Sequence, residues 1–234
     1  MGNLNLILAR HGNTFNPNDK VTWVGSRNDL PLVHAGIQQA KHLAESFLWA
    51  GITLDAIFCG PLTRTRRFAD IVKKTLDLPY AVTIDKRLNE LDYGEWSGLT
   101  DTEVIEKFGS EFFDNWSKYG VWPAVGSWGQ SESEIRDEVA SFAQDLLNNY
   151  RETSNILAVS SSGRLRYFLT LVEGLWERSC QASNLKVGTG RICLSWHNGA
   201  SWQMSAWNID AKEAGELLCA AKHIEAKPTP TFEG

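Results

Sequence analysis

Short apolar runs alternate along the 234-residue chain with longer segments in which apolar residues recur every three or four positions. The runs long and continuous enough to be strands buried on both faces of a sheet are Leu4–Ala9, Ala56–Cys59 and Asn155–Ser160. The segments with helical spacing lie between and beyond these runs and cover 35–48, 62–76, 133–150 and 165–172. This alternation favours parallel pairing, so it predicts a three-layer α/β/α sandwich with a mainly parallel central sheet.

The end of the chain has a different pattern. Residues 191–196 and 202–207 are rich in apolar and aromatic side chains, and they flank Asn198-Gly199, a dipeptide that favours a tight turn. We therefore predict a closing antiparallel hairpin after the parallel strands. Its outer edge is able to pair with a second copy of the chain, so a homodimer is a hypothesis.

The middle of the chain, residues 85–130, is rich in glycine, tryptophan and acidic residues and shows no strand pattern. It predicts an insertion of short helices and loops over the site, where the substrate would be selected. Residues 1–234, with this insertion included, are interpreted as one domain, because 43% hydrophobic residues suffice to fill a single core. Residues 227–234 contain two prolines and predict a flexible tail.

Charge and cysteine spacing narrow the possible partners. The net charge of −5 comes from mixed signs with no basic stripe, which argues against a nucleic-acid partner. No run approaches the roughly 20 apolar residues that cross a bilayer, and the first residues lack a signal-peptide pattern. The four cysteines are far apart, without metal-site or disulfide spacing. We expect a cytoplasmic protein with reduced thiols and no membrane partner.

Polar side chains follow two of the predicted strands directly. His11 comes after the first strand, and Ser160–Gly163 joins the third strand to the next helix. In open parallel sheets, chemistry gathers at the carboxyl ends of the strands. A single histidine at such a position is weak evidence, because many are only structural. The case depends on four separated segments, which are Arg10–Asn16, Pro61–Thr65, Leu88–Gly94 and Ala158–Arg166.

In this order and on these elements, the four segments resemble the histidine phosphatase superfamily, also called the phosphoglycerate mutase-like family. The resemblance covers nearly the whole chain. It implies that His11 accepts the phosphoryl group, that Arg10 and Arg64 clamp the phosphate, and that Asn16 is a further donor. The chemistry suits these residues, because a phosphomonoester dianion repels nucleophiles unless fixed positive charge surrounds its oxygens. Planar guanidinium groups provide that charge, and a neutral histidine can then attack phosphorus.

The resemblance also implies a proton donor to the leaving oxygen. Glu90 lies in the segment where the family carries this carboxyl group, and Asp92 and Glu95 are alternatives nearby. The segment from Gly94 to Thr100 resembles broad phosphatases more than glycolytic mutases. No motif for a cofactor or a metal is present, so we expect a metal-independent reaction.

The chain departs from the family pattern after the third strand. The family's second histidine corresponds to Ser161, which keeps a hydroxyl donor for phosphate but loses the positive charge. Removing one such contact commonly costs about 10² to 10³ in rate. Gln130 stands where phosphatase-type relatives usually carry a glutamate. Both changes predict a weakened or specialised site.

The serines after the third strand allow two other interpretations. A serine nucleophile on a strand-to-helix turn requires a glycine two residues before it, but Ala158 and Val159 precede Ser160 and Ser161. The serines could instead cap the following helix, which is compatible with phosphate binding.

Three hypotheses for function remain open. The first is a phosphatase that hydrolyses a small phosphorylated metabolite and releases phosphate through phospho-His11. The second is a mutase, which has to keep the same intermediate away from water until it returns the phosphoryl group. The third is a binding or regulatory module for a phosphorylated ligand that has lost most of its turnover, and Ser161 motivates it.

Overall fold

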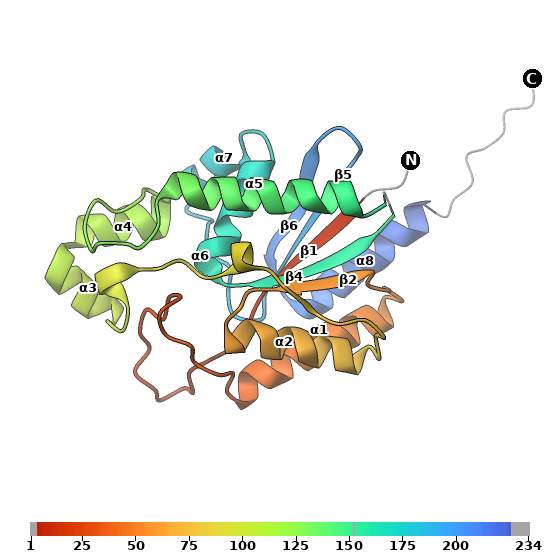
Figure 1. Cartoon of the computed structure of the whole chain (residues 1–234), viewed down its shortest axis with the longest axis horizontal. Helices are drawn as coiled ribbons and strands as arrows, with labels where there is room; N and C mark the ends of the chain where they lie inside the picture. The colour runs from red at the N-terminus through yellow and green to blue at the C-terminus, as the bar shows by residue number, and fades with distance from the viewer. Residues whose placement is uncertain (1–3, 152, 226–234) are drawn as a thin grey trace, which may run out of the picture.

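The computed structural model describes residues 4–151 and 153–225, and these form a sheet between two layers of helices (Figure 1). The strands are β1 (Leu4–Arg10), β2 (Ala56–Cys59), β3 (Thr83–Ile84), β4 (Asn155–Ser160), β5 (Ile192–His197) and β6 (Trp202–Ile209). Their order across the sheet is β3-β2-β4-β1-β5-β6. The first four strands in that order pair in parallel, whereas β5 and β6 are antiparallel. The predicted sandwich with a closing hairpin is confirmed.

Helices cover both faces of the sheet (Figure 1). The α-helices are α1 (His34–Trp49), α2 (Thr63–Thr75), α3 (Asp101–Phe108), α4 (Ser110–Tyr119), α5 (Glu132–Asn149), α6 (Ser162–Leu165), α7 (Leu175–Gln181) and α8 (Ala211–Glu225). Three short 3-10 helices are η1 (Lys86–Leu88), η2 (Gly94–Trp96) and η3 (Arg166–Leu171). Helices α1, α2 and α8 pack on one face, and α5 with η3 packs on the other.

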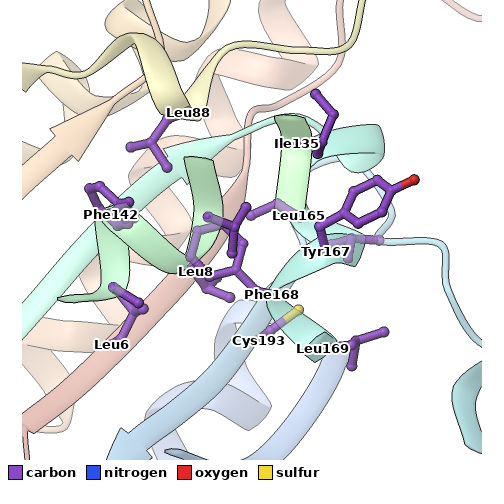
Figure 2. Close-up of a cluster of buried hydrophobic side chains, with 14 of the residues drawn as sticks. Leu6, Leu8, Leu88, Ile135, Phe142, Leu165, Tyr167, Phe168, Leu169 and Cys193 are labelled. Carbon is purple, nitrogen blue, oxygen red and sulfur yellow. The ribbon is translucent and has the colours of Figure 1, made fainter. Parts of the chain in front are cut away.

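Strand β1 shows how the apolar pattern builds both layers. Leu6 and Leu8 point into the core beneath α5, which Figure 2 shows, whereas Ile7 and Ala9 point into the core beneath α1 and α2. All four side chains are buried, because successive residues of a strand face opposite sides of the sheet. The continuous apolar run in the sequence therefore reflects a strand in the centre of the sheet.

The parallel pairing of β1 with β4 brings two distant loops together. Arg10 is the register partner of Ser160, and the backbone N–H of His11 donates to the Ser160 carbonyl at 3.0 Å. The loop after β1 and the start of α6 thus lie side by side at one edge of the sheet. This is the position where the sequence predicted the chemistry.

Most predicted elements are confirmed to within a residue or two. Strands Ala56–Cys59 and Asn155–Ser160 have the predicted bounds. The helix predicted at 165–172 is wrong in type, because α6 ends at Leu165 and residues 166–171 continue as a 3-10 helix. The strand β3 and the helices α7 and α8 had no counterpart in the prediction. The predicted tail 227–234 lies outside the described residues.

The insertion at 85–130 contains η1, η2, α3 and α4 and no strand, as predicted. It extends beyond the end of α5 (Figure 1). Its core is a chain of edge-to-face aromatic contacts with ring centroids 4.7–5.8 Å apart. The tryptophans in this chain are Trp23, Trp96, Trp116, Trp122 and Trp128. Half of the ten tryptophans therefore serve one aromatic core, although they are scattered in the sequence.

The cysteines show no disulfide. All four are free, and burial raises the pKa of Cys59 and Cys193 to about 12, so these thiols stay protonated at neutral pH. In the described part of the chain, none of the helices combines the length and the apolar character required to span a membrane.

Candidate active site

A cavity of about 940 Å³ opens where β1 and β4 end. It is lined by the segment from Arg10 to Gly25, by parts of the insertion, and by the connection after β4. The side chains of His11, Arg64 and Glu90 from three different segments meet there. The structure therefore brings these predicted site residues together.

The His11 ring is fixed in one tautomer by its two neighbours. Its Nδ1 atom lies 2.8 Å from the carbonyl oxygen of Gly12, which can only accept, so Nδ1 carries the proton. Its Nε2 atom accepts from the Nε–H of Arg64 at 3.2 Å. The unprotonated nitrogen is thus Nε2, and its lone pair becomes available to an electrophile once the Nε–H of Arg64 turns away, as a nitrogen nucleophile requires.

The environment of His11 also keeps its ring uncharged. Burial, reinforced by the charges of Arg10 and Arg64, lowers the pKa of His11 well below its ordinary value of 6.5. The hydrogen bond with Gly12 opposes this shift but is the smallest of the causes. The ring is therefore neutral and nucleophilic at physiological pH.

Arg64 is held rigidly by backbone carbonyl groups. Its terminal nitrogens donate to the carbonyl oxygens of Gly25 and Asn28 at 2.8 and 2.9 Å. The start of its helix is fixed by Asp29, which accepts from the backbone N–H and the hydroxyl of Thr63 at 2.7 Å. Only the Nε–H of Arg64 is directed at His11, so the guanidinium group is oriented before any substrate arrives.

Two further arginines reach the same cavity. Arg10 donates to the Val187 carbonyl at 2.7 Å, and Arg166 donates to the Trp116 carbonyl at 3.0 Å. The guanidinium carbon of Arg166 lies 4.0 Å from the centre of the Trp116 ring, so it is also stacked on this aromatic side chain. The Nε atoms of both arginines are buried and have no hydrogen-bond partner among the described residues.

Burial lowers the pKa of all three arginines, although guanidinium groups remain charged in proteins. Glu90 opposes this shift in all three, because its carboxyl group raises the pKa of each arginine. Even with Glu90 ionised, the cluster keeps a surplus of two positive charges. Buried charge of this kind is costly unless it is neutralised, so the cavity is suited to a dianion.

Glu90 is anchored to the start of α6. Its carboxyl oxygens accept from the backbone N–H groups of Leu91, Arg164 and Gly163 at 2.9, 3.2 and 3.4 Å. Gly163 is required for this contact, because a Cβ atom there would collide with the Glu90 carboxyl group and the Tyr93 hydroxyl. The Tyr93 side chain adds a hydrogen bond to Glu90, and burial raises the pKa of Tyr93 well above 10.

The two alternatives to Glu90 lie elsewhere. Asp92 pairs with Arg27 at 2.6 Å, and the exposed Glu95 pairs with Lys107 at 3.1 Å. Neither of them lines the cavity. Among these three carboxyl groups, Glu90 is the one that lines the cavity together with His11.

Ser161 is fully buried, and its hydroxyl has no hydrogen-bond partner in the described part of the chain. The cavity wall is formed instead by Ser162 and Gly163. Ser161 stands at the cap position of α6 but makes no side-chain cap bond, and the Ser162 hydroxyl accepts from the Val187 N–H at 3.2 Å. The capping interpretation is therefore wrong for Ser161, and its role toward phosphate remains a prediction.

Asn16 lines the cavity, but its side-chain amide is directed elsewhere. Its Nδ2 atom and its backbone N–H both donate to Asp19, at 3.0 and 2.7 Å. One hydrogen of this amide is therefore engaged by Asp19, and its contact with phosphate remains a prediction. In the described residues there is no group of three or more histidine, cysteine, aspartate or glutamate side chains placed to hold a metal ion.

Several residues at the cavity were missed by the sequence reasoning. Arg166 ends the segment Ala158–Arg166, but the sequence predicts no role for it, because nothing local distinguishes it from the arginines at positions 66 and 67, which are exposed. Trp23 and Asp101 come from segments far apart in sequence, and the Trp23 indole N–H donates to Asp101 at 2.8 Å. Only the fold brings these residues to one cavity.

Curated relatives of this chain are named as mutases. The 2,3-bisphosphoglycerate-dependent phosphoglycerate mutase of Azorhizobium caulinodans is 29% identical over 189 residues, which cover 78% of this chain and 88% of the relative. The mutase of the same name from Nitrobacter winogradskyi is 30% identical and covers 78% of this chain and 87% of the relative.

Solved structures with the same fold are named as phosphatases. A mycobacterial glucosyl-3-phosphoglycerate phosphatase solved with VO3 matches with a TM-score of 0.72 and 21% identity, covering 88% of this chain and all of that one. The α-ribazole phosphatase of Shigella flexneri matches with a TM-score of 0.69 and 24% identity, covering 88% and 96%. At these identities the likeness establishes the fold alone. The family model for the histidine phosphatase superfamily (branch 1) matches residues 6–210. The chain therefore belongs to the histidine phosphatase superfamily, as the four sequence segments indicated.

Proposed function

We propose that this protein hydrolyses a small phosphomonoester through a covalent phosphohistidine at His11, without a metal ion. The observation that carries the proposal is the uncharged His11 ring, with its Nε2 lone pair at a cavity that three buried arginines line. A neutral nucleophile surrounded by fixed positive charge is what the attack on a phosphoryl dianion requires.

The first half of the reaction transfers the phosphoryl group to the protein. The Nε2 lone pair of His11 forms a bond to phosphorus as the bond from phosphorus to the leaving oxygen breaks. Arg10, Arg64 and Arg166 stabilise the negative charge on the phosphoryl oxygens, and Glu90 gives its proton to the leaving oxygen. For this attack the Nε–H of Arg64 has to leave Nε2 first, and it turns to a phosphoryl oxygen.

The second half releases phosphate. Water attacks phosphorus, its proton passes to the Glu90 carboxylate, and the bond between phosphorus and Nε2 breaks. Orthophosphate leaves, and both His11 and Glu90 return to their starting states. Glu90 is suited to both roles because its hydrogen bonds to backbone N–H groups hold the carboxyl group at one position.

A phosphoglycerate mutase is the second candidate, because relatives at 29–30% identity carry that name. It would use the same phosphohistidine but return the phosphoryl group to the substrate instead of to water. Conversion of 3-phosphoglycerate to its isomer in the presence of 2,3-bisphosphoglycerate, without net release of phosphate, would favour the mutase.

Replacement of His11 tests the nucleophile. We expect His11→Ala to abolish metal-independent release of phosphate from small phosphomonoesters and to remove the acid-labile phosphoryl label from the protein. His34→Ala is a matched control, since His34 is exposed on α1, and it should keep full activity. Phosphate release measured with a chelator present distinguishes the results, and persistent turnover in His11→Ala would refute the proposal.

The charge state of His11 can be measured directly. Because the pKa of His11 is lowered, its ring should stay neutral at pH 6.5, with the proton on Nδ1, and should gain a second proton only well below that pH. Nitrogen chemical shifts of labelled histidine across a pH titration report this, and His11→Ala assigns the signal. Arg10→Met should raise the pKa of His11, because it removes one of the positive charges that lower it.

Replacement of Arg166 tests its role in binding the phosphoryl group, and Arg164, which is also buried, provides the control. We expect Arg166→Gln to lower kcat/KM about 10²-fold or more and to weaken inhibition by vanadate, because it removes a charge from the phosphoryl site. Arg164 is also buried but pairs with Glu138 at 2.6 Å outside the cavity. Arg164→Gln should therefore leave vanadate inhibition unchanged. Equal losses in both variants would assign Arg166 a structural role only.

Position 161 tests whether a missing histidine limits turnover. We expect Ser161→His to raise kcat about 10²-fold, because an imidazole is longer than the buried serine side chain and can bring a cationic donor into the adjoining cavity. Ser161→Asn is the matched control, since it adds a longer polar side chain without a charge. An unchanged rate in a folded Ser161→His protein would show a site adapted to serine. Activity that appears only in Ser161→His would indicate a binding or regulatory module instead.

A further inference from the structure

The cavity has a second wall that the proposed phosphoryl transfer does not use. It is apolar and aromatic, and its side chains are Phe15, Val21, Trp23, Val24 and Phe113. Four of them come from the loop after β1, and Phe113 comes from α4 in the insertion. An apolar wall beside a cluster of charges gives the cavity two chemically different ends.

Contacts within the protein hold the central residue of this wall, Trp23, in position. The Trp23 ring lies edge-on to Tyr93 at 5.0 Å and to Phe113 at 6.1 Å between centroids. The backbone of Trp23 is paired with the insertion, since it donates to the Leu99 carbonyl and accepts from the Gly98 N–H at 2.8 and 2.7 Å. The aromatic surface is therefore in place before a ligand arrives.

The charges at this wall disfavour an anionic ligand group. The carboxylate of Asp101 lines the cavity and is held there by the Trp23 indole N–H at 2.8 Å. Lys186, a cation outside the arginine cluster, also lines the cavity, and both it and Asp101 are exposed, so water screens both charges; Asp101 differs in being held at the wall by its hydrogen bond to Trp23. A carboxylate or second phosphate at this end would face a like charge and an apolar surface.

The arginine cluster offers nothing further for a second anion. One phosphoryl dianion offsets two of the three guanidinium charges, and Glu90 offsets the third once it has given its proton to the leaving oxygen. A substrate with another negative group would leave that group without a buried partner, which is costly. The volume of about 940 Å³ leaves room for a sizeable group beyond the phosphoryl site.

We propose that the cavity selects phosphomonoesters whose leaving group is an uncharged, flat apolar or aromatic alcohol, bound against Trp23 and Phe113. The inference rests on the proposed function, since it places the phosphoryl group at His11. It deepens that function by naming the substrate class. It also separates this chain from an enzyme for glycerate phosphates, whose leaving group carries a carboxylate.

Binding of phosphonates tests the wall without turnover, because their carbon–phosphorus bond is not hydrolysed. We expect 3-phenylpropylphosphonate to bind at least about tenfold more tightly than 3-carboxypropylphosphonate, measured by calorimetry and by tryptophan fluorescence. Binding of the carboxyl compound with equal or greater affinity would overturn the proposal. So would a failure of both compounds to bind.

Two neighbouring phenylalanines on α4 provide a matched pair of variants. Phe113 lines the cavity, whereas Phe112 packs against the core on the same helix and does not. Phe113→Ala should weaken binding of the phenyl compound about tenfold and leave binding of the carboxyl compound unchanged. Phe112→Ala, with folding checked by thermal unfolding, should leave the affinities for both compounds unchanged. Equal effects of the two variants would contradict a specific contact with Phe113.

Asp101→Asn tests the charge at the wall with little change in shape. It should strengthen binding of the carboxyl compound several-fold, because it removes the repulsion between the Asp101 carboxylate and the carboxylate of the ligand. The affinity for the phenyl compound should stay unchanged. No gain for the carboxyl compound would contradict this part of the argument.

The proposed selectivity of the apolar wall and the proposed hydrolysis can be tested separately. Selective phosphonate binding without phosphate release from 2-phenylethyl phosphate would refute the proposed hydrolysis and leave the wall supported. Phosphate release with equal kcat/KM for 2-phenylethyl phosphate and 3-phosphoglycerate would keep the hydrolysis and overturn the selectivity.

Discussion

Three guanidinium groups share one cavity with an uncharged histidine, and this concentration of positive charge constrains the structure around it. Removing such groups from water is expensive, so each has to find acceptors within the protein. Backbone carbonyl groups meet much of this need, because they accept hydrogen bonds at any pH and are fixed by the fold. The acceptors are the carbonyl oxygens of Gly25, Asn28, Trp116 and Val187. They belong to the long loop after β1, to α4 and to the loop before β5. Positioning the charges therefore fixes the loops that surround the cavity.

The sequence could predict the parts of the fold that depend on local apolar pattern. The strand Ala56–Cys59 is a continuous apolar run because it packs against a hydrophobic core on each face of the sheet. Its bounds were therefore predicted correctly from the sequence. The two residues of β3 are exposed at the edge of the sheet, so they leave no such pattern. Residues 166–171 have helical apolar spacing but form a 3-10 helix, because the pattern does not distinguish between two kinds of helical turn over so short a segment.

The candidate site was predictable only where motif and topology coincide. His11 follows a central strand, so its place at the sheet edge could be inferred from sequence. Arg166, Trp23 and Asp101 could not be inferred in the same way, because their roles depend on contacts between segments far apart in the chain. The same limit applied to Ser161, since the turn from β4 into α6 decides which of two adjacent serines faces the cavity. The structure directs Ser162 to the cavity and leaves Ser161 buried.

Under the proposed mechanism, the serine at position 161 and the arginine at position 166 are connected. If the family's second histidine is replaced by Ser161, the site lacks one cation, but Arg166 from the same connection reaches the cavity five residues later. The attraction for a phosphoryl dianion therefore does not require a histidine at position 161. An arginine cannot exchange protons near neutral pH, whereas a histidine can. With Arg166 in place of a histidine as the cation, the site therefore keeps its electrostatic attraction for phosphate more fully than any step that transfers a proton. Arg166 is also stacked on Trp116 in the aromatic core of the insertion. The charge that binds the phosphoryl group and the wall that would bind the leaving group are thus supported by the same set of tryptophans, which makes the position of one dependent on the other.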